Sequence, residues 1–307
     1  MPSPKPLQLE PLTTEISRTP FQNALRRFRR HRSARAGMFV LGILTLAAIF
    51  APLIAPYDPI KPLRDVKRRS PPCIHILGCP GDQSQHIFGT DGNQRDLFSR
   101  VVYGARLSLS IGVATVTFAI VIGVVLGALA GYSGGWSDNL IMRVMDVLLA
   151  FPSLILAIAI VAVLGPGLAN ALLAISFVSI PIYARLVRAS VLQVKEQDFV
   201  SASRALGASP MGILSRHVLP NALTPLIVAA TLGIASAILD AAALSFLGLG
   251  AAPPTPEWGL MLGEERNSLF NAPHLVFFPG TFIMITVLAF NLLGDGLRDA
   301  LDPRLAN

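Results

Sequence analysis

Long runs of residues without a charged side chain constrain this sequence more than any other feature. One run extends from Val147 to Ala184, and shorter runs lie on both sides of it. A helix of roughly 20 apolar residues crosses the hydrocarbon core of a membrane, so these runs are long enough to span one. Only 14% of the 307 residues are charged, against about 25% in soluble domains. The pattern predicts an all-α integral membrane protein and excludes a soluble domain.

Six transmembrane helices are expected when glycine and proline are used to divide the apolar runs. The run at 147–184 is too long for one span, and the Leu-Gly-Pro-Gly sequence at 164–167 divides it into a helical hairpin. The second span is expected to end at the Gly134-Gly135 turn. The predicted spans lie at 37–56, 107–132, 147–164, 168–184, 222–247 and 275–293. An even number of spans leaves both termini on one side of the membrane.

The distribution of basic residues predicts that this side is the cytoplasm. Positions 1–36 contain eight Lys and Arg residues but only two acids, and cytoplasmic segments next to a span are rich in Lys and Arg. Residues 1–36 are therefore predicted to be a cytoplasmic tail, with an amphipathic segment at 21–28 on the lipid surface. Residues 295–307, which include Arg298 and Arg304, form the predicted cytoplasmic C-terminal tail. The basic character reflects topology, and no nucleic-acid partner is expected.

The segment at 57–103 is then an extracytoplasmic loop, although it contains many basic residues. Aspartates are interspersed among them, and long loops of mixed charge follow the positive-inside rule less strictly. Both cysteines, Cys73 and Cys79, lie in this loop, where an oxidising compartment permits a disulfide. Two free thiols are the alternative. No metal site is expected, because the cysteines form no standard zinc spacing with His75 and His86.

A segment of mixed polarity at 199–220 lies between the fourth and fifth spans, on the side predicted to be cytoplasmic. It is expected to form a short helix, a glycine with positive φ at Gly207, and a second short helix that ends before Pro220. The small residues Ala202 and Ser203 would let another protein surface approach closely. An ordinary cytoplasmic loop is the alternative.

This segment resembles the cytoplasmic coupling segment of bacterial ABC importer permeases. The family pattern is Glu-Ala-Ala, three residues, Gly, nine residues, and then Ile-x-Leu-Pro. Gly207 and Leu219-Pro220 stand at the required separation, whereas Ser201 and His217 replace the usual Glu and Ile. The replacement at 201 puts an ionic contact from that position in doubt. The resemblance implies these ATPase-coupling residues: Ser201, Ala202, Ser203, Gly207, Leu219 and Pro220.

Further stretches resemble the peptide and nickel branch of these permeases, and specifically the second, C-type permease of dipeptide importers. They lie at 86–91, 95–109, 244–250, 253–259 and 294–303. Within this similarity, Gln94 replaces a usual glycine. The resemblance implies a type I permease domain at 104–294 that carries dipeptides or short peptides across the bacterial cytoplasmic (inner) membrane.

The resemblance also implies partners: a homologous second permease, two cytoplasmic ABC ATPases and an extracytoplasmic peptide-binding protein. None of the four lysines follows a glycine, so the phosphate-binding G-x-x-x-x-G-K-[ST] loop is absent. The chain is therefore not expected to be an enzyme or to bind a cofactor. ATP and Mg are expected on the partner ATPases.

Asp240 is the clear carboxylate within a predicted span, and acids inside a membrane are usually functional because burying a charge there is costly. It is a candidate for the substrate path. Pairing with the partner permease or with a nearby Arg is the structural alternative. Trp258, beyond the end of this span, is expected to be an interfacial anchor.

Other transport functions remain open at this stage. Nickel, glutathione or oligopeptide import would use the same kind of permease, because the external binding protein sets much of the selectivity. A secondary transporter driven by an ion gradient is the alternative from a different class, and such proteins often contain inverted repeats and several buried acids. Neither feature is found here. A membrane scaffold would not require the helix pair around Gly207.

Overall fold

The computed structural model describes residues 28, 31–64, 66–81 and 83–301. Within these residues the chain is helical, and no sheet forms beyond two isolated backbone pairs, Cys73 with His86 and Thr90 with Asp96. Most of the predicted N-terminal tail, including residues 21–27 of its amphipathic segment, lies outside the described residues, as do residues 302–307. The all-α fold expected from the sequence is confirmed.

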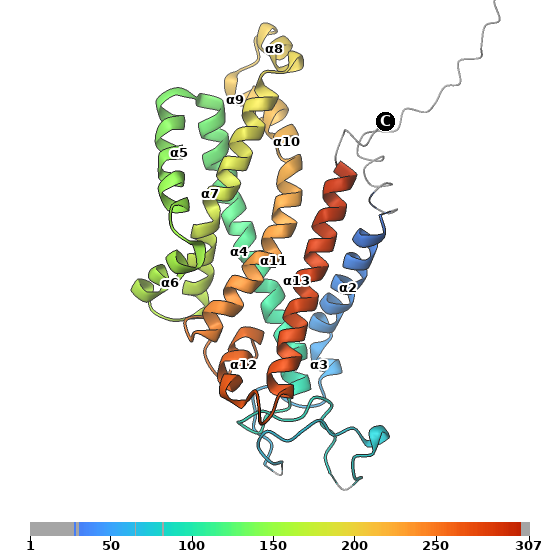
Figure 1. The fold of residues 1–307 in the computed structure, drawn as a ribbon. Helices are drawn as coiled ribbons and strands as arrows, with labels where there is room; N and C mark the ends of the chain where they lie inside the picture. Colours follow the sequence, from blue (N-terminus) through green and yellow to red (C-terminus); the bar gives the residue numbers. More distant parts are fainter. Residues whose placement is uncertain (1–27, 29–30, 65, 82, 302–307) are drawn as a thin grey trace, which may run out of the picture.

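Five helices in the described part of the chain are long and apolar enough to cross a membrane. They run side by side for much of their length (Figure 1). These helices are α2 (Arg32–Ile49), α4 (Leu97–Ser133), α7 (Leu168–Lys195), α11 (Thr224–Phe246) and α13 (His274–Leu301). A bent pair, α5 (Gly135–Leu149) and α6 (Ser153–Leu164), supplies the sixth span if the two are counted together.

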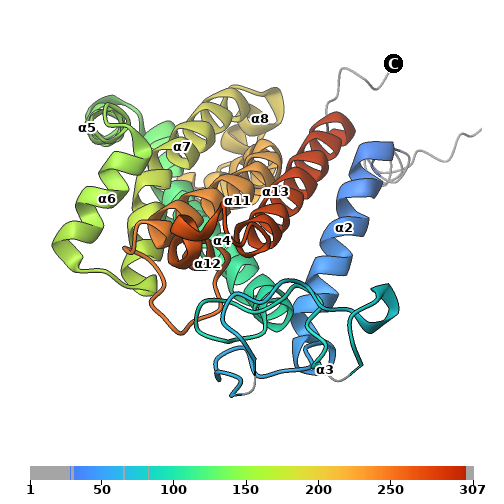
Figure 2. The same ribbon diagram turned by 60° about the horizontal axis from the view of Figure 1, so that its bottom comes forward.

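The third span differs from the prediction of one helix at 147–164. The chain instead begins this span at Gly135, and α5 and α6 meet at a bend of 92° (Figure 2). Pro152 explains the position of the break. Proline disfavours the helical conformation for the residue before it, here Phe151, and it cannot donate a backbone hydrogen bond. Because no charge marks the break, hydropathy alone did not reveal it.

Several predicted boundaries lie inside helices. Helix α4 begins at Leu97, within the predicted loop 57–103, because the Asp96 side chain caps it by accepting a hydrogen bond from Ser99 N at 2.8 Å. Helix α13 continues to Leu301, through the start of the predicted tail 295–307. Helix α2 begins at Arg32, within the predicted tail 1–36, and the short helix α3 (Ala51–Ile54) follows it.

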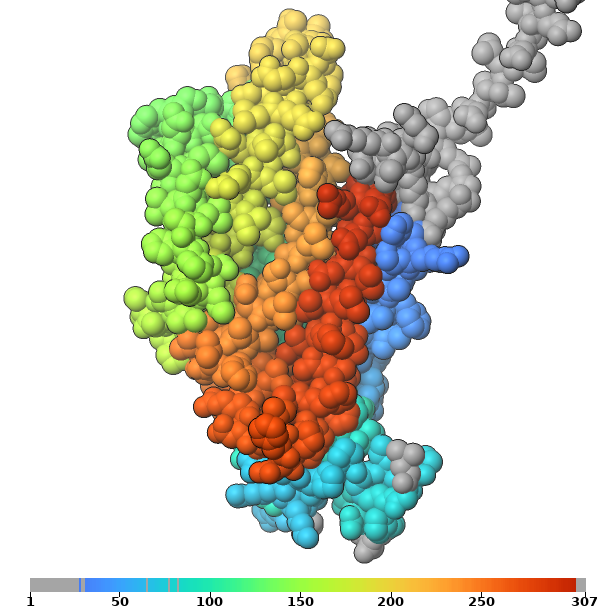
Figure 3. All heavy atoms as spheres, viewed as in Figure 1, coloured from blue at the N-terminus to red at the C-terminus, as the bar shows by residue number. Residues whose placement is uncertain are grey.

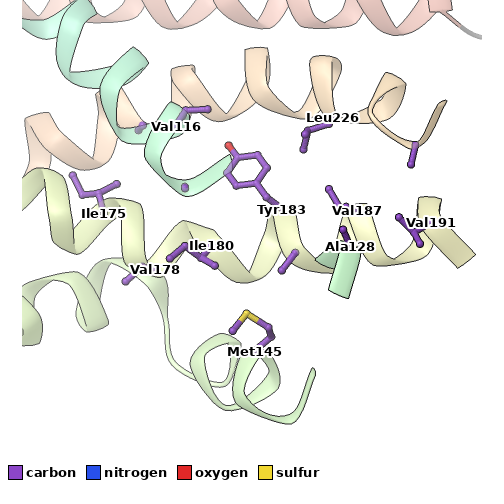
Figure 4. Close-up of a cluster of buried hydrophobic side chains, with 14 of the residues drawn as sticks. Val116, Ala128, Met145, Ile175, Val178, Ile180, Tyr183, Val187, Val191 and Leu226 are labelled. Atoms are coloured by element: carbon purple, nitrogen blue, oxygen red, sulfur yellow. The ribbon is translucent and has the colours of Figure 1, made fainter. Parts of the chain in front are cut away.

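Helices α4 and α7 form the centre of the bundle, and glycines allow their close approach. Gly123, Gly127 and Gly131 recur every four residues along α4, so they share one face. A Cβ atom on Gly123 would lie 2.7 Å from Cβ of Tyr183, and one on Gly131 would lie 3.0 Å from the Arg188 carbonyl oxygen. The main cluster of buried apolar side chains surrounds this contact (Figure 4).

The outer surface of the bundle is apolar. Large hydrophobic side chains are exposed on three different spans, among them Phe39 (70%), Val163 (87%) and Met284 (60%). A soluble protein seldom exposes so much apolar surface. This surface fits the hydrocarbon of a membrane.

Candidate functional site

The segment between α7 and α11 projects from one end of the bundle (Figures 1 and 3). Its first part is α8 (Asp198–Ala205). Gly207, with φ of +81°, ends the helix, and the Ala208 N–H donates to the Ser203 carbonyl at 3.1 Å. This six-residue closure is a Schellman motif, which favours glycine at the left-handed position. The predicted short helix and positive-φ glycine are both present.

The second part differs from the prediction of a short helix that ends before Pro220. Helix α9 (Pro210–Ile213) leads into a π-turn at Leu214–Val218, and helical backbone continues through Pro220 in α10 (Leu219–Ala222). The wider π-turn accommodates the proline ring, which would clash with the carbonyl four residues earlier in a regular α-helix. The chain therefore enters α11 with little interruption.

The predicted coupling residues are not all brought together. Ser201, Ala202, Ser203 and Gly207 lie on or just after α8, at the projecting tip, whereas Leu219 and Pro220 lie in α10 at the base, next to α11 (Figure 1). Buried apolar residues, Val200, Ile213 and Val218, join the segment to the main core cluster. The tip is thus attached to the bundle through packed side chains.

Two apolar residues at the tip were not identified from the sequence. Leu206 is 89% exposed and Met211 is 69% exposed, on either side of the Gly207 turn. Phe199 on α8 is 40% exposed. Exposed apolar residues at the aqueous end of a membrane protein are typical of a surface that contacts another protein. Their position around a positive-φ glycine was the signal available in the sequence.

A cavity of about 560 Å³ lies between α6, α7 and α11. Asp240 contributes the one charged side chain of its lining, and within the described residues its carboxylate has no hydrogen-bond or ion-pair partner. Tyr183 and three serines supply hydroxyl groups, and the remaining lining is apolar or glycine. The nearby Arg that was one alternative for Asp240 is therefore not found among the described lining residues. The cavity can accept a small ligand with both polar and apolar parts.

Comparisons with known proteins identify the family. Residues 123–307 match the model of the binding-protein-dependent transport system inner membrane component. The chain belongs to this family. Residues 19–72 match the N-terminal transmembrane domain of oligopeptide transport permease C. The chain is therefore a permease subunit of an ABC importer, a non-catalytic membrane component, as the sequence predicted.

Curated relatives cover nearly the whole permease. It is 46% identical to the dipeptide transport system permease protein of Alkalihalophilus pseudofirmus, over 99% of this chain and 96% of the relative. Identity to the di/tripeptide transport system permease protein of Pseudomonas aeruginosa is 48%, over 94% of each chain. Identity to the glutathione transport system permease protein of Escherichia coli is 50%, over 94% of this chain and 92% of the relative. The predicted peptide branch is confirmed.

A solved structure supports the fold. A chain of the inward-facing MetNI methionine ABC transporter superimposes with a TM-score of 0.55 at 23% identity. The match covers 66% of this permease and 96% of that chain. The two chains therefore share a fold over almost all of that chain and about two thirds of this one.

The permease has a polar cap at the end of the bundle opposite α8 (Figure 2), built from the described residues of 55–96 and 247–273 and the first turn of α4. Three arginines and three acids form buried or half-buried ion pairs there. Their N–O distances are 3.0 Å for Arg69–Glu265, 2.6 Å for Arg95–Asp91, 3.0 Å for Arg95–Glu264, 3.2 Å for Arg100–Glu264 and 3.4 Å for Arg100–Asp91. These pairs neutralise three of the many basic residues at this end of the bundle.

Trp258 contradicts the prediction of an interfacial anchor. It is fully buried at the start of α12 (Trp258–Glu265), and its indole N–H donates to the Val101 carbonyl at 2.9 Å. Gly104 on α4 leaves room for the ring. The adjacent Glu257 is also buried and caps α12 by accepting from Gly259 N and Leu260 N. Burial raises the pKa of the Glu257 carboxyl, which the two backbone donors oppose.

Cys73 and Cys79 are joined by a disulfide in the structure, with their Cα atoms 5.3 Å apart. The bond closes a small loop on the cap, and Cys73 also exchanges two backbone hydrogen bonds with His86. His75 lies close to both sulfurs. Sulfurs bonded to each other are not thiolates, and zinc is bound by thiolates. The described residues of this loop therefore fit a disulfide better than a metal site.

Proposed function

We propose that the permease carries dipeptides or other short peptides across the bacterial cytoplasmic membrane. The observation that supports this substrate is the identity of 46–50%, over more than nine-tenths of the chain, to relatives named for dipeptides, di- and tripeptides, and glutathione. Glutathione is the second candidate, because a relative named for it is 50% identical. Oligopeptides are a further alternative, because residues 19–72 match the N-terminal domain of oligopeptide transport permease C. Nickel is a weaker one, since these three relatives are not named for it.

The permease works with a homologous second permease, two ABC ATPases and an extracytoplasmic peptide-binding protein. ATP and Mg bind to the ATPases, and the second permease completes the path next to the α6, α7 and α11 cavity. The α8–α10 segment contacts one ATPase. Ser201, Ala202, Ser203 and Gly207 form the contact, while Leu219 and Pro220 join it to α11. The packed residues beneath the tip support this role, because a rigid attachment transmits movement to the spans.

Both termini lie in the cytoplasm, and the polar cap faces the exterior. The basic N-terminal sequence supports this orientation. Basic residues usually mark the cytoplasmic side, so those of the cap count against this orientation. Three of them, Arg69, Arg95 and Arg100, are paired with acids, which weakens that objection. The disulfide between Cys73 and Cys79 is a further argument, since disulfides persist in oxidising compartments outside the cytoplasm.

Thiol labelling tests this orientation. In sealed spheroplasts, a membrane-impermeant maleimide is expected to leave the native permease unlabelled until an impermeant reductant opens the Cys73–Cys79 bond. A Ser215→Cys variant carries a thiol on the exposed surface of the α8–α10 segment, and this thiol is expected to react only after the membrane is permeabilised. Reaction of the introduced thiol in sealed spheroplasts would contradict the orientation.

Reconstitution tests the function itself. The two permeases and two ATPases are assembled in liposomes with the binding protein, and uptake is measured with labelled dipeptides, tripeptides, glutathione and Ni²⁺. We expect uptake of short peptides that requires ATP and stops when this permease is omitted. Uptake that an ion gradient drives in the absence of the ATPases would instead support a secondary transporter. Uptake of Ni²⁺ or glutathione alone would replace the proposed substrate.

A further inference from the structure

Among the described residues, Asp240 differs from Asp138 and Asp146 of α5, which pair with Arg188 and Arg185. It lies in α11, sixteen residues after Thr224, which corresponds to about 24 Å along the helix axis at 1.5 Å per residue. Six further residues lead to the end of the helix at Phe246, on the side of the polar cap. The carboxylate therefore lies inside the span, near the end of the cavity that is closer to the cap.

The charge of the cavity is not balanced. Asp240 is the single ionisable acid of the described lining, and no Lys, Arg or His lines the cavity with it. A carboxylate that is withdrawn from water without a partner is unfavourable. A ligand that brings a positive charge would offset this cost, whereas a neutral or anionic ligand would not. The cavity thus favours a cationic group at the Asp240 end.

Tyr183 and three serines contribute hydroxyl groups to an otherwise mostly apolar lining. The Tyr183 ring is buried in the core cluster, and its hydroxyl oxygen lies against Gly233 of α11, where a Cβ atom would collide with it (Figure 4). Gly233 is seven residues before Asp240 on the same helix, or about 10 Å along the axis. Ser179, one turn from Tyr183 on α7, also lines the cavity. The Tyr183 hydroxyl can donate to a carbonyl or carboxylate oxygen, whereas the Ser179 hydroxyl donates to the Ile175 carbonyl at 2.8 Å and keeps its acceptor capacity for a ligand.

The dimensions fit a short peptide. An extended chain spans at most about 3.5 Å per residue, so a dipeptide needs about 7 Å and a tripeptide about 10 Å. The distance between the levels of Gly233 and Asp240 accommodates either. The volume of about 560 Å³ also lies within the range of roughly 300 to 1,000 Å³ that is common for small-molecule sites.

We propose that Asp240 binds the α-ammonium group of the peptide during its passage, while the Tyr183 hydroxyl faces the carboxyl end of the peptide. The proposal rests on the function proposed above and adds a residue and a direction to it. The peptide enters from the cap, and its ammonium group meets Asp240 first. The pairing is a charge-assisted hydrogen bond at a partly desolvated position.

The test uses the complete importer in liposomes with a saturating concentration of its binding protein. Asp240→Asn is expected to lower the rate of labelled Ala-Ala uptake at least tenfold, because it removes the charge and retains the volume. Asp58→Asn, which changes an exposed acid of the cap, serves as the control and is expected to stay within twofold of the native rate. Co-purification of the second permease and the ATPases with each variant is measured in parallel.

A charge-rescue variant separates recognition from packing. Asp240→Cys is expected to lose uptake, regain it when a sulfonate-bearing methanethiosulfonate restores a negative charge, and stay inactive after reaction with a trimethylammonium reagent. The native cysteines do not react, because they are bonded to each other. Equal effects of the two reagents would overturn the proposal.

Two other results would overturn the proposal, and a third concerns the function. Uptake by Asp240→Asn within twofold of the native rate shows that the carboxylate does not recognise the peptide. Loss of the second permease from Asp240→Asn shows that Asp240 instead pairs with that subunit. If the native importer takes up no peptide at all, the proposed function fails first, and the Asp240 site fails with it.

Discussion

Replacing Leu206 and Met211 by aspartate is expected to release the ATPase subunits from the permease and abolish ATP-dependent uptake. Both side chains are largely exposed at the tip of the α8–α10 segment, and we propose that an ATPase covers them. Burying an apolar side chain of this size contributes about 1.5 to 3 kcal/mol. Loss of two such contacts lowers the affinity by a factor of about 100 or more. The amount of ATPase that co-purifies with the permease measures this effect.

The control is a matched double substitution of two exposed apolar residues by aspartate on the polar cap. Ile60 and Ile76 are exposed on the polar cap, by 46% and 95%, and we expect the Ile60→Asp/Ile76→Asp variant to retain the ATPases. Neither variant removes a buried side chain, so both are expected to accumulate in the membrane to the native level. If the ATPases stay bound to the Leu206→Asp/Met211→Asp variant, the tip is not their contact surface.

The sequence was sufficient to locate five of the six predicted spans, because a charge is costly in a membrane and uncharged runs therefore mark the helices. It was not sufficient for the shape of the third span. The break at Phe151-Pro152 occurs within an apolar run, and a proline in such a run can either kink a helix or end it. Pro181 illustrates the other outcome, since it lies inside α7 without ending it.

The candidate sites were predictable to different degrees. The position of Gly207 followed from spacing, because a short helix followed by a positive-φ turn has a strong preference for glycine. The exposure of Leu206 and Met211 could not be predicted. An apolar residue in a short segment can either pack into the protein's own core or remain exposed to contact another subunit. Asp240 was visible as an acid in a span, but the cavity around it depends on helices that are distant in the sequence.

The polar cap was the least predictable part, because its interactions connect residues far apart in the chain. Trp258 is separated by 157 positions from the carbonyl that it donates to. Arg100 approaches Glu264 across 164 positions. From the sequence alone, these arginines were basic residues in a loop predicted to be extracytoplasmic, where the positive-inside rule does not expect them. Their pairing with Asp91, Glu264 and Glu265 neutralises them and connects the loop at 55–96 to α4 and α12.

Arg100 is the residue on which this connection depends most. It is 1% exposed, its Nη2 is 3.2 Å from Glu264, and its Nη1 donates to the carbonyls of Pro59 and Pro254 at 3.0 and 3.1 Å. One guanidinium therefore contacts the loop at 55–96, the turn before α12 and α12 itself. Its removal would leave the Pro59 and Pro254 carbonyls without this donor, and Asp91 and Glu264 with Arg95 as their remaining arginine partner.

We expect Arg100→Ala to destabilise the permease by about 3 to 5 kcal/mol, the usual effect of removing one partner of a buried ion pair. The thermal unfolding midpoint in detergent should fall by many degrees, and protease should cleave the loop at 55–96 below that midpoint. Lys61→Ala is the matched control, because the Lys61 side chain is 81% exposed and pairs with Asp58 at 3.4 Å. Exposed pairs contribute about 0 to 1 kcal/mol, so its midpoint should hardly change. Equal midpoints for the two variants would mean that the arginine network does not hold the cap in place.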